Sequence, residues 1–104
     1  MKIVRVSYTV KADYAEQNQQ NIRQVMADLQ KLNHTGIHYH VCLGPDSKSF
    51  THNAYFKAEE DQQILLGLPS FKHFQEQLKA SGPEAPPKQE FLTLVGSSNS
   101  FFNS

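Results

Sequence analysis

Two histidines and a cysteine stand at alternate positions of one short segment, GIHYHVCLG, at residues 36–44. Side chains two residues apart on a β-strand point to the same face and lie about 6.6 Å apart. His38 and His40 are therefore spaced to approach one cation together, or to take a proton from a substrate near neutral pH. A metal site, a catalytic pocket and a strand that simply carries imidazoles all fit this spacing. The residues that the neighbouring strand places beside the two histidines decide among them.

The neighbouring strand is predicted at SFTHNAYFK, residues 49–57, after the turn GPDSK. A five-residue loop would place His52 opposite His40 and complete a three-histidine site. The same register would turn the apolar side chains of the strand away from the core, namely Phe50, Ala54 and Phe56. Burial favours a shift by one residue, through a bulge near the turn, which returns them to the core together with His52. We therefore predict no metal, with His52 on the helix side of the sheet and His38 and His40 on the other; a zinc or copper site is the less favoured alternative.

The shifted register gathers polar side chains on the face away from the helices. Beside the two histidines it places Thr51, Asn53 and Tyr55, with Arg5, Ser7 and Thr9 across the sheet. Such a set offers an imidazole that titrates near neutral pH, amide and hydroxyl donors for an anionic oxygen, and one guanidinium. We predict His40 as a general base, with Arg5, His38, Asn53 and Tyr55 as substrate-binding residues. The alternative is that these groups only satisfy one another across a dimer interface.

The elements that must position this set follow the order strand, helix, strand, strand, helix, strand. Strands are predicted at 2–11, 36–44, 49–57 and in EFLTLVG (90–96), with helices up to about residue 33 and from about residue 59 to Gly82. This order predicts an α+β, ferredoxin-like βαββαβ domain over residues 1–96, in which both helices cover one face of an antiparallel sheet. Residues 97–104 form a tail that we expect to be frayed; docking of its two phenylalanines on a neighbouring chain is the alternative.

Composition excludes several classes of partner. Ten basic residues balance ten acidic ones, so no net field draws in nucleic acid or an anionic membrane. No stretch approaches the roughly 20 apolar residues of a membrane span. A single cysteine, Cys42, forms no internal disulfide, which agrees with a reducing compartment. We expect a cytoplasmic protein that binds neither nucleic acid nor membrane.

The face opposite the helices is polar but scarcely charged. An antiparallel sheet that faces water usually carries Lys, Glu and Thr in quantity, whereas a surface of His, Ser, Thr and Cys suits a wet cavity or an interface. We therefore expect a homodimer in which a second copy covers this face.

Four segments together resemble a known superfamily, the dimeric α/β barrels. They are VRVSYTVK (4–11), FTHNAYFKAEED (50–61), LPSFKHFQEQLKASGPEAPP (68–87) and EFLTLVGSS (90–98). Their layout is similar to that of the small antibiotic-biosynthesis-monooxygenase-like and stress-responsive members, and it covers nearly the whole chain. The resemblance implies two ferredoxin-like subunits packed sheet to sheet around a cavity.

The same resemblance implies a set of activities rather than one. The superfamily contains cofactor-free oxygenases of phenolic or quinol compounds, haem-degrading and haem-binding enzymes, isomerases and proteins without known activity. The chain has no tryptophan, which departs from the Asn, Trp and His set of the haem-degrading members. No flavin or nicotinamide glycine motif appears, so we expect no cofactor. Two functions stay open: a cofactor-independent monooxygenase or isomerase acting on a small phenolic or quinol compound in the inter-sheet cavity, and a non-catalytic metabolite-binding or stress-related dimer.

Overall fold

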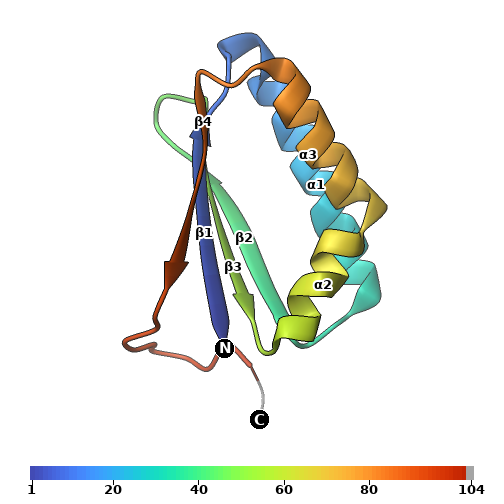
Figure 1. Ribbon diagram of the computed structural model, residues 1–104, viewed down its shortest axis with the longest axis vertical. Helices are drawn as coiled ribbons and strands as arrows, with labels where there is room; N and C mark the ends of the chain where they lie inside the picture. Colours follow the sequence, from blue (N-terminus) through green and yellow to red (C-terminus); the bar gives the residue numbers. More distant parts are fainter. Residues whose placement is uncertain (103–104) are drawn as a thin grey trace.

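A four-stranded antiparallel sheet carries all the helices on one face in the computed structural model, which describes residues 1–102 (Figure 1). The elements in chain order are β1 (Lys2–Thr9), a 3-10 turn (Ala12–Tyr14), α1 (Ala15–Leu32), β2 (Ile37–Leu43), β3 (Ser49–Phe56), α2 (Glu59–Gly67), α3 (Pro69–Ser81) and β4 (Ala85–Leu92). The strand order is β2-β3-β1-β4. The predicted α+β, ferredoxin-like fold is confirmed. No helix within residues 1–102 is long and apolar enough to cross a membrane.

Local residue choices set the ends of the helices. Asn33 takes a left-handed φ of 48° after α1, and Gly82 takes a φ of 67° after α3, the conformation that commonly ends a helix. Pro69 separates α2 from α3, because the residue before a proline avoids the helical region; Leu68 is extended there. Asp61 caps α2 by accepting a hydrogen bond from the Ala58 backbone N–H at 2.8 Å.

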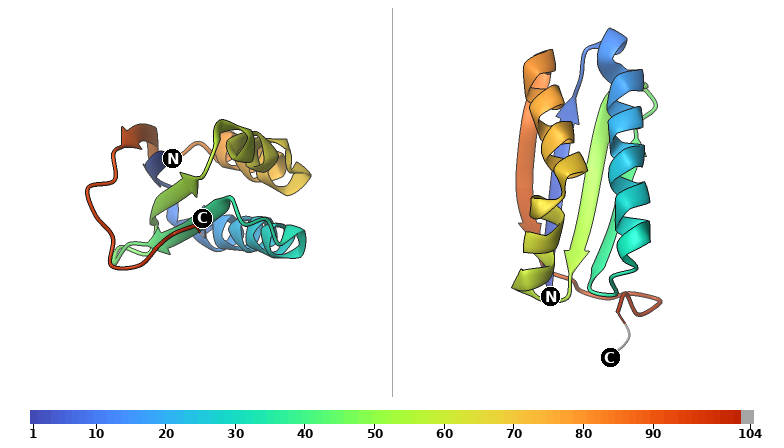
Figure 2. Two further views of the ribbon diagram at one scale, coloured as in Figure 1. Left: turned by 90° about the horizontal axis from the view of Figure 1, so that it is seen from below. Right: turned by 90° about the vertical axis from the view of Figure 1, so that its right-hand side faces the viewer.

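The core lies between the sheet and the helix layer. Its buried members on the strands are Val4, Tyr8, Phe50, Ala54 and Phe56, with Val10 directly after β1, and those on the helices include Ile22, Val25, Leu65, Phe71, Phe74 and Leu78. Figure 2 shows the two long helices side by side over this face, with the C-terminal segment on the far side of the sheet. The apolar alternation along β1 and β3 therefore predicts correctly which side of each strand is buried.

The register of β2 against β3 is the shifted one. His40 pairs with Asn53 and Val41 with His52, so His52 faces the helices while His40 faces away. The additional residue is taken up in the turn, where the Gly44 N–H donates to the Ser49 carbonyl at 2.7 Å and Ser47 adopts a φ of 63°. The prediction that His52 and the other two strand histidines lie on opposite faces is confirmed, and the three-histidine arrangement does not form.

The C-terminal part of the chain differs from two expectations. The last strand begins at Ala85 rather than near residue 90, so Pro86 and Pro87 belong to it. Prolines are tolerated there because β4 is an edge strand, paired only with β1. The tail is not simply frayed: the Phe101 ring stacks on Tyr55 at a centroid distance of 4.3 Å, on the sheet face opposite the helices. Residues 103 and 104 lie outside the described residues.

Candidate functional site

A pocket of about 470 Å³ lies between the sheet and the helix layer, on the side of α2 and α3. We call it the helix-side pocket. Its walls are mostly apolar, and they include Val4, Val6, Ala54, Phe56, Leu65, Phe71, Phe74 and Leu78. Its polar lining residues of the strands β1, β2 and β3 are Tyr8, Tyr39 and His52. Small-molecule sites are usually apolar pockets of about 300 to 1,000 Å³ with a few polar groups that orient the ligand, and the helix-side pocket has this form.

The three polar groups form one hydrogen-bonded chain. His52 Nε2 lies 2.7 Å from the Tyr8 hydroxyl, and His52 Nδ1 lies 2.6 Å from the Tyr39 hydroxyl. Asn18 of α1 donates from Nδ2 to the Tyr8 oxygen at 2.9 Å. The register explains the meeting: His52 pairs with Val6 on β1 and with Val41 on β2, so the tyrosines two positions away are its diagonal neighbours on the same face.

Burial keeps the three hydrogen-bonded side chains uncharged. Desolvation lowers the pKa of His52 from 6.5 to about 4, because the imidazolium loses its hydration in the core. Burial likewise raises the pKa of both tyrosines well above the usual value of 10. At neutral pH the pocket therefore presents a neutral imidazole held between two neutral hydroxyls, which suits a ligand with flat apolar rings and an oxygen at one end.

The five site residues predicted from the sequence gather on the opposite, open face. Arg5, Asn53 and His40 stand in one cross-strand row, and Tyr55 and His38 stand in the next. The His38 and His40 rings are 5.8 Å apart, and each lies about as close to Tyr55, at 5.6 and 6.1 Å. The structure thus brings the predicted set together, but on the face that does not line the helix-side pocket.

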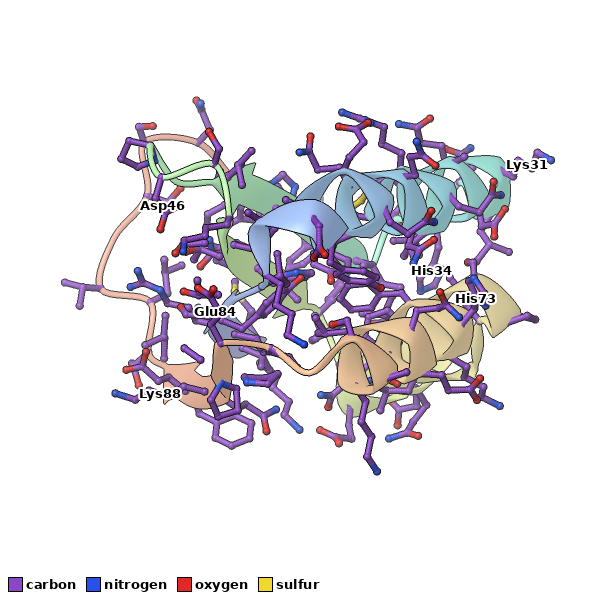
Figure 3. The ribbon with its side chains drawn as sticks, turned by 90° about the horizontal axis from the view of Figure 1, so that it is seen from above. Lys31, His34, Asp46, His73, Glu84 and Lys88 are labelled. Atoms are coloured by element: carbon purple, nitrogen blue, oxygen red, sulfur yellow. The ribbon has the colours of Figure 1, made fainter. Side chains whose placement is uncertain are left out.

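The remaining histidines do not join either group. His34 and His73 lie on the helix side of the molecule, whereas Lys88 lies on the sheet side (Figure 3). His34 Nε2 contacts the Asp61 carboxylate at 2.5 Å, and this contact lowers the pKa of Asp61. No group of three or more His, Cys, Asp and Glu side chains in residues 1–102 is placed to hold a metal ion.

Sequence reasoning missed His52, Tyr8 and Tyr39 as site residues because all three occupy positions assigned to the core. A signal for them exists. His52 stands between Phe50 and Ala54 on a buried face, and a buried polar side chain requires hydrogen-bond partners. The two strands beside it each offer a tyrosine on the same face, so the network follows from the register once His52 is accepted as buried.

No protein-family model matches the chain, and no curated protein matches its sequence. Solved structures match it in fold. A provisionally named antibiotic biosynthesis monooxygenase from Nitrosomonas europaea has a TM-score of 0.77 at 15% identity, covering 92% of this chain and all of that one. A protein of Mycobacterium tuberculosis has a TM-score of 0.77 at 10% identity over 94% and 98% of the two chains.

A third similar structure carries a description of its activity. It is a point mutant of SnoaB from Streptomyces nogalater, described as a cofactor-independent oxygenase, with a TM-score of 0.68 at 14% identity over 95% of this chain and 98% of that one. Identities this low bear on the fold and not on the reaction. The chain therefore has the ferredoxin-like fold of the antibiotic-biosynthesis-monooxygenase-like proteins.

Proposed function

We propose that the protein binds a compact phenolic or quinol compound in the helix-side pocket and oxidises it with O₂ without a cofactor. The observation that carries the proposal is the buried imidazole of His52, held between two tyrosine hydroxyls in the wall of a mostly apolar pocket of about 470 Å³. The described activity of the similar SnoaB structure agrees with it.

The proposed oxidation requires no electron donor other than the substrate. A phenol with a free para carbon is oxidised to a quinone, with one atom of O₂ entering the ring and the other leaving as water, so the substrate itself supplies all four electrons. The protein must favour the phenolate form of the substrate, orient it and keep bulk water away. Hydrogen-bond donation to the substrate oxygen stabilises the phenolate, and the apolar walls around Phe71 and Phe74 exclude water.

Oxygen uptake and ligand binding, measured together, test this function. We expect the purified protein to consume O₂ with at least one phenol or quinol from a panel of one- to three-ring compounds, and to shift the NMR signals of His52 on binding it. Binding without O₂ consumption would instead support the non-catalytic metabolite-binding function. No binding by any compound of the panel would contradict both.

The open face is a second candidate site, and one observation favours it. The Phe101 ring packs against Tyr55 and His38, at centroid distances of 4.3 and 5.3 Å. A flat aromatic substrate that displaced Phe101 would pack on the same two rings and lie beside His40. At this site His40 would act as the base, and Arg5 and Asn53 would hold the substrate oxygen.

We also propose that the protein is a homodimer in the cytoplasm. On β2 and β3 the open face carries His, Cys, Thr, Asn and Tyr rather than Lys and Glu. Every residue of β4 is exposed, and apolar side chains continue along the C-terminal segment, with Phe91 66% exposed and Val95 fully exposed. Light scattering at micromolar concentration is expected to give twice the mass of the chain, because burying these side chains favours association. A monomer mass would remove the inter-sheet cavity and leave the helix-side pocket as the remaining site.

A further inference from the structure

We propose that Asn18 fixes the direction of the hydrogen bonds around His52, so that Nδ1 carries the imidazole hydrogen and the Tyr39 hydroxyl donates to the ligand. Asn18 is then a positioning residue, acting from α1 through Tyr8 and His52. The assignment of the imidazole hydrogen stands on the protein alone. The statement about the ligand rests on the proposed function of the helix-side pocket.

The direction begins at the amide of Asn18. This side chain is fully buried, and its Nδ2 lies 2.9 Å from the Tyr8 oxygen. An amide nitrogen donates and does not accept, so the Tyr8 oxygen is the acceptor in this bond. The single hydrogen of the Tyr8 hydroxyl is then free for His52 Nε2, at 2.7 Å. If His52 Nε2 donated instead, the Tyr8 oxygen would accept twice and the Tyr8 hydrogen would have no acceptor within residues 1–102, in a side chain that is only 4% exposed. The lone pair is therefore assigned to His52 Nε2.

The direction of the hydrogen bond between His52 and Tyr39 follows from the neutrality of the imidazole. A neutral histidine has one N–H and one lone pair, so with Nε2 as acceptor the hydrogen is on Nδ1. Nδ1 then donates to the Tyr39 oxygen at 2.6 Å. The hydrogen of the Tyr39 hydroxyl has no acceptor among residues 1–102. Tyr39 and His52 both line the helix-side pocket, so this hydrogen is available to a ligand there.

Rotating the Asn18 amide by 180° would reverse the donor and acceptor in each of these hydrogen bonds. Tyr8 would donate to Asn18, His52 would donate from Nε2 to Tyr8, and Tyr39 would use its hydrogen on Nδ1. The position now held by Asn18 Oδ1 is buried and has no partner within residues 1–102. After rotation the amino group would occupy that position without an acceptor. Orphaned N–H groups are rarer in buried sites than under-satisfied carbonyl oxygens, so the orientation in which Asn18 donates is the favoured one.

The direction of the hydrogen bonds determines which kind of ligand oxygen the Tyr39 hydroxyl can bind. A hydroxyl that donates its hydrogen is matched by an acceptor, which is a carbonyl or a phenolate rather than a group that only donates. Such a donor also strengthens its bond as negative charge builds on the oxygen. His52 then donates to the Tyr39 oxygen and orients the Tyr39 hydroxyl, and it is not the group that removes a proton from the substrate.

Nitrogen-15 NMR on the unmutated protein tests the assignment directly. Two- and three-bond correlations between the ring nitrogens and the carbon-bound hydrogens of His52 distinguish the two neutral forms. We expect a protonated Nδ1 and an unprotonated Nε2. The opposite pattern would overturn the inference whether or not any ligand binds.

Asn18→Asp tests the positioning role, because an ionised carboxylate only accepts. At mildly alkaline pH this variant is expected to reverse the direction of the hydrogen bonds, so that the His52 ring hydrogen moves from Nδ1 to Nε2. Asn21→Asp is the matched control: Asn21 lies one turn further along α1, is similarly buried and contacts Gln17 and Tyr14 instead. A His52 spectrum that stays unchanged in Asn18→Asp, or that changes equally in Asn21→Asp, would contradict the role of Asn18.

The ligand statement is tested with 1-tetralone and its oxygen-free analogue tetralin as probes. In the unmutated protein the ketone is expected to bind about tenfold more tightly than tetralin, the worth of one good hydrogen bond. Tyr39→Phe, which keeps the ring and removes the donor, is expected to abolish this preference, as is Asn18→Asp. Equal affinity in the unmutated protein would overturn the donor role of Tyr39. A protonated Nδ1 in a protein that binds neither probe would support the assignment and contradict the proposed pocket function instead.

Discussion

Acidification from pH 6.5 to pH 4 is expected to remove about 3 kcal/mol of folding stability through His52 alone. In the folded protein burial lowers the pKa of His52 from 6.5 to about 4. The unfolded chain, whose histidine is solvated, binds the proton throughout this interval and the folded chain does not. Stability is therefore fully present above about pH 6.5 and falls as the pH is lowered towards 4, by about 1.4 kcal/mol per pH unit.

Urea unfolding at a series of pH values measures this loss, and His52→Phe isolates it. The variant keeps a ring in the core and removes the titrating group, so its stability is expected to fall much less over the same interval. His40→Phe is the matched control, since His40 is exposed on the open face of the adjacent strand. Equal pH dependence of the unmutated protein and His52→Phe would contradict a buried neutral imidazole.

The titration of Asp61 does not contribute to the loss of stability between pH 6.5 and pH 4. Its contact with His34 lowers its pKa below 3.8, so its contribution is lost only as the pH falls below that value, beneath the His52 interval. Should His52→Phe fail to fold, the unmutated protein still gives the answer by NMR: the ring of His52 is expected to keep the signals of a neutral imidazole down to about pH 4.

The register of the sheet was predictable because a one-residue slip carries a large penalty. Phe50 and Phe56 are almost completely buried, and the alternative pairing of β2 with β3 would have exposed both. The same reasoning places His52 correctly and assigns it no role, since apolar patterning identifies a buried position and does not identify what a polar residue does there. The partners of His52 come from two other strands, and only the assembled sheet shows that they meet it.

The C-terminal segment was less predictable for a different reason. The start of β4 contains Pro86 and Pro87, which local sequence rules assign to a link between elements. Its edge position, which makes prolines acceptable, is a property of the whole sheet. The contact of Phe101 with Tyr55 is likewise tertiary, because it joins residues 46 positions apart across the open face.

Replacing His40 by alanine is expected to show which face of the sheet carries the chemistry. Because His40 points away from the helix-side pocket, we expect turnover of a phenol or quinol to stay within about threefold of the unmutated protein. Tyr39→Phe, which removes the hydroxyl bonded to His52, is expected to lower turnover by about tenfold or more and to change the melting temperature little, since the ring remains in place.

The two alternatives for His40 predict distinct results in the same experiment. If His40 is the base of an open-face site, its loss lowers turnover by about a hundredfold or more, the usual contribution of a positioned base, and leaves dimerisation and melting temperature nearly unchanged. If His40 only satisfies partners across a dimer interface, its loss costs about 1 to 3 kcal/mol of stability and leaves the turnover of the folded protein unaltered. Melting temperature and oxygen uptake, measured on His40→Ala and Tyr39→Phe side by side, therefore separate all three cases. A hundredfold loss in His40→Ala together with full activity in Tyr39→Phe would move the active site from the helix-side pocket to the open face.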